Sequence, residues 1–135
     1  MIVDSSAAVA ILRREPDWSN LSKSLDAAQG AACMSAASYF ETGIVLDKLR
    51  NPVLGAKLDA FILDAEIAIE PVTVEQARIA RQAYRDYGRG SGHAANLNFG
   101  DCFSYALARA KRQPILFKGD DFGHTDLRSA VELGQ

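Results

Sequence analysis

The sequence predicts an α/β fold: a mainly parallel sheet of four or five strands with helices over both faces. Short apolar runs alternate with longer stretches whose apolar side chains recur every three or four residues, as strands and amphipathic helices do. The 135 residues are 48% apolar and 24% charged, which is ordinary for one globular domain. No internal repeat or linker divides the chain, so we expect a single domain over residues 1–135. Strands that alternate with helices are joined by right-handed crossovers, which makes their sheet parallel.

The first half of the chain contains three candidate strands with helices between them. The strands are expected at the short apolar runs 1–3, 31–34 and 67–72. Cap residues, helical spacing and breaking residues predict four helices, which run from Asp4 to a stop at Pro16, from Trp18 to Gly30, over 36–50, and from Pro52 to Ala65.

The second half continues the alternation. Thr73 and Gln76 have the spacing of a capping box and predict a helix that ends near Gly88. Residues 87–98 contain three glycines and few apolar residues, so we expect a mobile connection there. The remaining elements are expected to be a helix over 100–112, a strand over 114–117 and an edge strand over 130–133.

Charge and cysteine content exclude several classes of protein. Seventeen acids against fifteen bases give a net charge of −2, so there is no overall basic field for nucleic acid. The N-terminal segment reaches Asp4 too early for a signal peptide or membrane span, and we expect a cytoplasmic protein. Cys33 and Cys102 lack a C-x-x-C partner and are interpreted as buried thiols. His93 and His124 have no zinc partner at standard spacing.

Several acids follow predicted strands, where parallel sheets form their ligand crevice. Asp4 comes directly after the first strand, although it could simply cap the helix that follows. Asp120 and Asp121 come shortly after the strand 114–117, although they could equally belong to a solvated turn. Lys118, beside them, is either a group that steadies a phosphate or a plain surface lysine.

Two further acids lie on predicted helices. Glu41 could close a capping box opened by Ser38; if the helix has already begun by then, its neighbours three and four residues away are nearly all apolar. Asp101 stands in a first helical turn, where an acid favours the helix dipole. No charged side chain occurs between Cys102 and Ala108, which indicates an enclosed helix start where an acid requires a cation.

Carboxylates gathered at one edge repel one another unless divalent cations compensate them, and oxygen ligands favour Mg²⁺ or Mn²⁺. Other chemistries lack their motifs. The glycine-rich segment 87–93 does not follow a strand and lacks the G-K-[ST] ending of a phosphate loop. No G-x-S-x-G elbow of a serine hydrolase is present.

Four segments together, "MIVDSSAAVAIL", "SAASYFETGIVL", "LNFGDCFSYALA" and "ILFKGDDFGHTD", resemble the PIN-domain ribonucleases, and specifically the VapC-type toxins of bacterial toxin–antitoxin pairs. The resemblance spans nearly the whole chain. It implies a Rossmann-like, three-layer α/β/α sandwich whose acids bind one or two Mg²⁺ or Mn²⁺ ions. By motif, Asp4, Glu41 and Asp101 match the three firmest acidic positions, and either Asp120 or Asp121 the fourth.

The resemblance also implies partners: a cognate antitoxin that inserts a segment into the acidic cleft, toxin homodimers within a larger complex, and operator DNA contacted only by the antitoxin. The expected activity is endonucleolytic cleavage of RNA by water activated at the metal. Asp4 and Asp101 would hold the principal ion, and Glu41 with Asp120 or Asp121 would orient a second ion or the water. Two alternatives stay open, a PIN-like domain that binds RNA or protein without cutting and a receiver-type phosphoacceptor. For the latter, Glu70 would have to replace an aspartate after the third strand.

Overall fold

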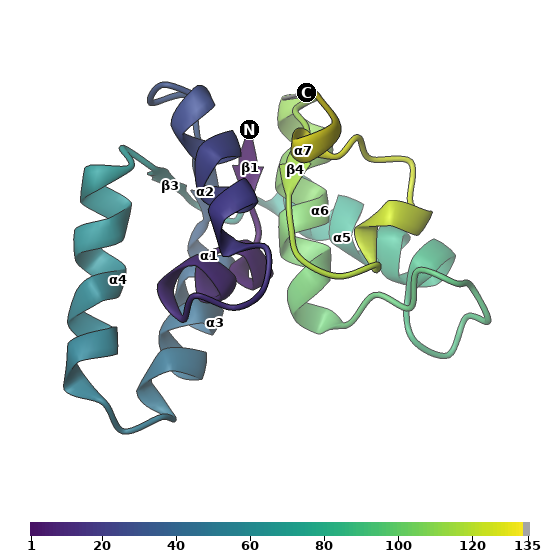
Figure 1. The fold of residues 1–135 in the computed structure, drawn as a ribbon. Coiled ribbons are helices and arrows are strands. Elements are labelled where there is room, and N and C mark those ends of the chain that lie inside the picture. Colours follow the sequence, from purple (N-terminus) through teal and green to yellow (C-terminus); the bar gives the residue numbers. More distant parts are fainter. Residues whose placement is uncertain (134–135) are drawn as a thin grey trace.

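The computed structural model describes residues 1–133 and contains a four-stranded sheet in the order β3-β2-β1-β4 (Figure 1). All three strand pairings are parallel, as the alternation of strands and helices predicts. The strands are short: β1 (Ile2–Val3), β2 (Cys33–Ser35), β3 (Ala68–Glu70) and β4 (Ile115–Leu116).

Residues 1–133 contain seven α-helices, and all but the last lie where the cap residues and helical spacing predict them. They are α1 (Ser5–Leu12), α2 (Trp18–Ala27), α3 (Ala36–Asp47), α4 (Pro52–Asp64), α5 (Val74–Tyr87), α6 (Phe99–Lys111) and α7 (Ala130–Leu133), with a 3₁₀ turn, η1 (Phe122–His124). Five of them begin at a side chain that accepts a hydrogen bond from a backbone N–H of the first turn: Asp4, Ser35, Asn51, Thr73 and Asn98. Among residues 1–133, no helix has both the length and the apolar character needed to cross a bilayer.

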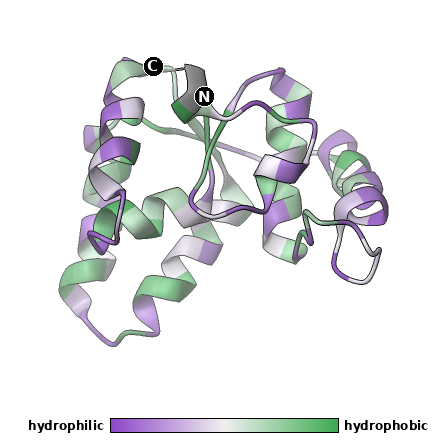
Figure 2. Ribbon diagram, turned by 45° about the vertical axis from the view of Figure 1, so that its right-hand side comes forward, coloured by the Kyte–Doolittle hydropathy of each residue, from purple (hydrophilic) through white to green (hydrophobic). Residues whose placement is uncertain are grey.

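The strand order makes the sandwich three-layered. The chain crosses the sheet from β1 through β2 to β3 and then returns to β4 on the far side of β1. Right-handed crossovers in these opposite directions place α1 and α2 on one face and α6 on the other. Helix α6 packs against β1, β2 and β4, and α5 packs on α6. Figure 2 shows hydrophobic strands in the middle of the molecule, between helices that carry both hydrophobic and hydrophilic residues, and the central side chains Ile2, Val3, Ile115 and Leu116 are fully buried.

One predicted element is wrong. Residues 130–133 form α7 and not an edge strand, and only Ser129 makes a bridge to Ile115 at this edge of the sheet. A four-residue apolar run fits either period, and here burial of Ala130 against the core formed with α2 decides for the helix. The connection 87–98 is closed at its base by a bridge between Gly88 and Leu97, and its mobility stays a prediction.

Candidate active site

Asp4 lies at the point where the direction of the sheet's connections changes. It directly follows β1, whose neighbours are β2 and β4, and its backbone N–H donates to the carbonyl oxygen of Leu116 at 3.0 Å. In open α/β sheets, the crevice at such a switch point is the usual ligand site. The side chain of Asp4 is only 1% exposed, and this burial raises its pKa.

Two buried serines support the Oδ1 oxygen of that carboxylate, one directly and the other through the first. The Ser104 hydroxyl, on α6, donates to Asp4 Oδ1 at 2.6 Å and lies 3.0 Å from the hydroxyl of Ser38 on α3. A hydroxyl carries one hydrogen, so Ser38 must be the donor to Ser104. The other oxygen, Oδ2, accepts from the backbone N–H of Ser6 at 3.0 Å and caps α1. These hydrogen bonds favour the ionised carboxylate and oppose the effect of burial on its pKa.

Glu41 reaches the same edge from α3. The helix begins at Ala36, capped by Ser35, so the alternative in which Ser38 and Glu41 form a capping box is wrong. Glu41 Oε1 accepts from the Ser5 hydroxyl at 2.7 Å, one residue from Asp4. Its other oxygen lies against the backbone of Gly100, where a side-chain carbon would collide with it. Only glycine at this position lets the start of α6 approach the Glu41 carboxylate so closely.

Asp101 occupies the third position of α6 and has a structural part as well. Its carboxylate accepts from the Asn98 backbone N–H at 3.0 Å, and Asn98 Oδ1 accepts from the Asp101 N–H at 2.8 Å, which completes a capping box. Burial is the main cause that raises the pKa of Asp101 to about 7, and the nearby carboxylates of Asp4 and Asp121 raise it further. Asp4 and Asp121 are therefore both close enough to Asp101 for their negative charges to repel its carboxylate.

The structure distinguishes between the two aspartates of the segment after β4. Asp121 is partly buried and lies within interaction distance of Asp101, whereas Asp120 is exposed. Of the candidates Asp120 and Asp121, only Asp121 is thus brought to the other acids. Lys118 is directed elsewhere, since its ammonium forms an ion pair with Glu15 at 3.3 Å.

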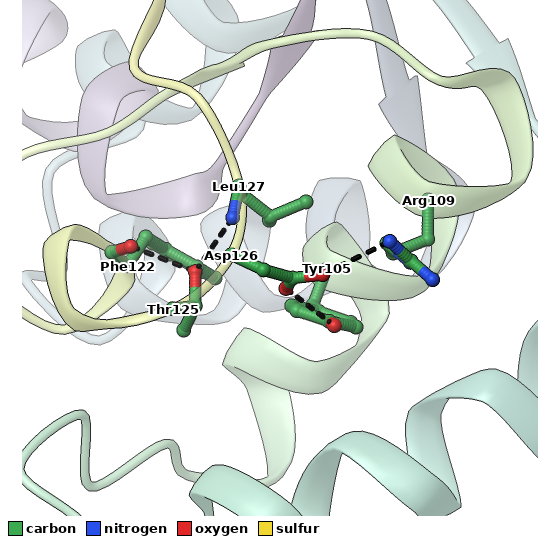
Figure 3. A network of polar contacts seen from close by, with 6 residues as sticks. All are labelled: Tyr105, Arg109, Phe122, Thr125, Asp126 and Leu127. Atoms are coloured by element: carbon green, nitrogen blue, oxygen red, sulfur yellow. Dashed lines mark hydrogen bonds and ion pairs between the residues drawn. The ribbon is translucent and has the colours of Figure 1, made fainter.

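Hydrogen bonds to α6 anchor the segment that follows Asp121 (Figure 3). Asp126 accepts from the Tyr105 hydroxyl at 2.7 Å and from Arg109 Nη1 at 2.9 Å. Thr125 Oγ1 donates to the Phe122 carbonyl at 2.7 Å and accepts from the Leu127 N–H at 3.2 Å. Asp126 therefore has a structural role, because it attaches this segment to α6.

Among residues 1–133, the four acids have no lysine or arginine as an ion-pair partner. Every ion pair found among residues 1–133 involves other acids, namely Glu15, Glu70 and Asp126. A buried all-oxygen set of uncompensated carboxylates is the chemistry that suits a hard divalent cation. Within the same residues, no three of these side chains are arranged to share an ion, and those of Asp4, Glu41 and Asp101 each accept a hydrogen bond from a protein donor.

The remaining candidates lie apart from this edge. Glu70, required by the phosphoacceptor alternative, ends β3 and forms an ion pair with Lys111 at 3.2 Å. His93 and His124 are exposed, as expected. Cys102 is buried, which raises the pKa of its thiol to about 11, whereas Cys33 is only half-buried.

The geometry adds residues that the sequence did not reveal. Ser5, Ser38 and Ser104 hold the acids, and Gly100 makes room for one of them. The only available signal was a serine or glycine on an otherwise apolar helix face, which occurs too often to identify a site.

Comparison with known proteins identifies the family. The PIN domain matches residues 1–127. Ribonuclease VapC28 of Mycobacterium tuberculosis is 56% identical over 132 residues, covering 98% of this chain and 98% of the relative. Ribonuclease VapC42 of the same species is 47% identical over 130 residues, covering 96% and 98%. The crystal structure of M. tuberculosis VapC20, described as a sarcin-ricin loop cleaving toxin, matches 93% of this chain and 95% of its own. The TM-score is 0.71 and the sequence identity is 20%, so the two chains share a fold. The chain therefore belongs to the PIN-domain family and, within it, to the VapC ribonucleases.

Proposed function

We propose that this protein is an endoribonuclease toxin of a toxin–antitoxin pair that cleaves RNA with the help of Mg²⁺ or Mn²⁺. The observation that supports the proposal is the approach of Asp4 and Asp121 to Asp101 beside the β1/β4 switch point, where Glu41 also reaches Ser5 and no ion pair among residues 1–133 compensates these acids. Its relatives, named ribonucleases, supply the substrate class. Acids that stabilised only the fold would be expected to pair with lysine or arginine.

Asp4 and Asp101 would hold the principal ion, and Glu41 with Asp121 would hold a second ion or orient the attacking water. A bound divalent ion would lower the pKa of water and stabilise the charge that develops on the departing oxygen. The hydroxyl of Ser104 favours the ionised form of Asp4 against the effect of burial, and the hydroxyl of Ser5 fixes the Glu41 carboxylate. Glu41 Oε2 is then the oxygen available to accept a proton from water. Attack by water on phosphorus with cleavage of the bond to the 3′ oxygen, which leaves as the hydroxyl, would give a 5′-phosphate and a 3′-hydroxyl.

Cleavage of an RNA oligonucleotide by purified protein tests this function. Activity is expected to disappear in EDTA, to return with Mg²⁺ or Mn²⁺, and to fall at least 100-fold in Asp4→Asn and Asp101→Asn. Asparagine retains the capping oxygen at both positions, so the fold should survive. Asp26→Asn, at an exposed position on α2, is the matched control and should keep full activity. Full activity in both site variants, in protein free of contaminating nuclease, would reject the proposal.

A cognate antitoxin and a second copy of the chain are the proposed protein partners, and operator DNA would be contacted only through the antitoxin. Exposed apolar side chains on α3, α4 and the turn between them support a protein interface; Ile44, Leu49 and Val53 are examples. Figure 2 shows hydrophobic turns on the helix pair that Figure 1 labels α3 and α4. Co-expression with the product of a neighbouring short reading frame should give a complex that suppresses cleavage and binds operator DNA, whereas the chain alone should not bind that DNA.

A further inference from the structure

A second hollow, which we call the arginine groove, opens between α5 and the start of α6. It has a volume of about 710 Å³ and contains none of the acids described above. Its wall includes three arginines and three aromatic residues, namely Arg81, Arg85, Arg89, Tyr84, Phe99 and Phe103.

The charges of α5 are divided between two faces. At 100° per residue, Arg81, Tyr84 and Arg85 fall on one side of the helix, whereas Glu75 and Asp86 fall on the other and line a separate hollow. In the part of the chain that the structure describes, none of the three groove arginines forms an ion pair. A protein with a net charge of −2 thus keeps one compact positive surface without acids.

The aromatic rings of the groove are presented to solvent. Phe99 is 78% exposed and packs edge-on against Phe103, with ring centroids 4.9 Å apart. Tyr84 is 46% exposed, and its hydroxyl donates to the Arg89 carbonyl at 3.1 Å, which fixes the ring beside that arginine. Exposing a phenylalanine to water is unfavourable unless its face has a partner.

Phe99 also connects the arginine groove to the acidic edge. It is the first residue of α6, two positions before Asp101, and together with Phe103 it lines the adjoining hollow that contains Glu41 and Gly100. A chain that crosses the acids can therefore continue past Phe99 into the groove.

We propose that the arginine groove holds a single-stranded segment of the RNA next to the cleaved bond, a proposal that rests on the function proposed above. Arginines bind phosphates, and exposed aromatic rings stack on bases of any sequence. A paired duplex hides the faces of its bases, whereas a single strand or loop offers them. Phe99 would stack one base, and Arg85 and Arg89 would bind phosphates that flank it.

Binding of a labelled single-stranded RNA oligonucleotide to EDTA-treated protein, measured by fluorescence anisotropy, tests the groove separately from catalysis. Arg85→Gln/Arg89→Gln is expected to weaken binding about 10-fold or more and to reduce the slope of log affinity against log salt by about 1.4, or 0.7 per lost phosphate contact. The matched control, Arg112→Gln/Arg128→Gln, removes two exposed arginines near the opposite end of α6 and should change affinity less than 2-fold.

Phe99→Ala should weaken binding about 5- to 100-fold, and Phe99→Trp should retain it, because stacking requires an aromatic face. In cleavage assays with Mg²⁺, the groove variants should raise KM and change kcat by less than about 3-fold. An unlabelled duplex of the same sequence should compete at least 10-fold less well than the single strand.

The outcomes separate the two proposals. If the unsubstituted protein binds RNA through the groove but never cleaves it, the ribonuclease assignment fails and the groove stands. If it cleaves RNA and the groove variants keep its KM and affinity, the groove assignment is overturned and the activity stands. Equal competition by the duplex, or variants that alter only the oligomeric state on size-exclusion chromatography, would also overturn the groove assignment. Absence of RNA binding in EDTA together with absence of cleavage in Mg²⁺ would overturn both.

Discussion

Titration of Asp101 should make the metal-free protein less stable as the pH rises from about 4 to 7. Its pKa is about 7 in the fold, against 3.8 for a solvated aspartate, so the folded state binds the proton more tightly. Below the pKa of the solvated aspartate, ionisation of Asp101 costs the folded protein no stability. The free energy of unfolding then falls as the pH rises through the pKa of Asp101 in the fold. At 1.36 kcal/mol per pKa unit, the full difference would be about 4 kcal/mol. Because Asp101 is only partly buried, solvent screening reduces the expected loss to about 1–2 kcal/mol.

Urea unfolding in EDTA at pH 5 and pH 8 measures this loss. The pKa of Asp4 is raised as well, so its contribution has the same sign. Asp101→Asn keeps the capping oxygen, removes the charge and should be more stable than the unsubstituted protein at pH 8 but not at pH 5. Added Mg²⁺ should restore stability chiefly at pH 8, where the carboxylates are ionised. The reasoning would be refuted if metal-free protein were more stable at pH 8 than at pH 5 and Asp101→Asn left that dependence unchanged.

Three further substitutions test individual contacts. Asp121→Asn should reduce RNA cleavage at least 10-fold while Asp120→Asn stays within 2-fold, and the reverse order in the same assay would exchange their assignments. Ser104→Ala leaves Asp4 Oδ1 without a hydrogen-bond donor and should reduce the free energy of unfolding, measured in urea, by about 1–3 kcal/mol. An unchanged free energy of unfolding would contradict this prediction. Gly100→Ala should reduce cleavage at least 10-fold, because its methyl group displaces the glutamate carboxylate of α3, whereas Gly123→Ala, which meets no neighbour within 4 Å, should not.

The order of elements could be predicted because each carries local signals. Cap residues such as Asn51 and Thr73 lie directly before their helices, and Pro52 occupies the first turn of α4. The strand order could not be read in this way, because pairing β4 with β1 depends on contacts between residues more than a hundred positions apart. Residues 130–133 show the limit: four apolar residues fit a strand or a helix until tertiary packing decides.

Only the acidic residues of the candidate site could be predicted from the sequence. An acid between apolar residues is costly, so Asp4, Glu41 and Asp101 stand out in the sequence. The choice between Asp120 and Asp121 depends on the orientation of a turn after β4. In the fold, the hydrogen bonds between Asp126 and α6 fix the segment that contains this turn. No local sequence pattern encodes these contacts. The serines and Gly100 are ordinary helix residues until the helices are packed together.

Capping and cation binding are not competing explanations for Asp4 and Asp101, because both follow from one arrangement. Each carboxylate accepts a backbone N–H at the start of a helix, where the helix dipole favours negative charge. Burial opposes that charge and raises both pKa values, and repulsion from nearby carboxylates raises the pKa of Asp101 further. The caps hold the two acids in place, whereas protonation or the proposed cation would relieve the unfavourable electrostatics. A surface cap would lack this second property, so the burial of Asp4, more than its capping hydrogen bond, distinguishes a ligand site from an ordinary helix start.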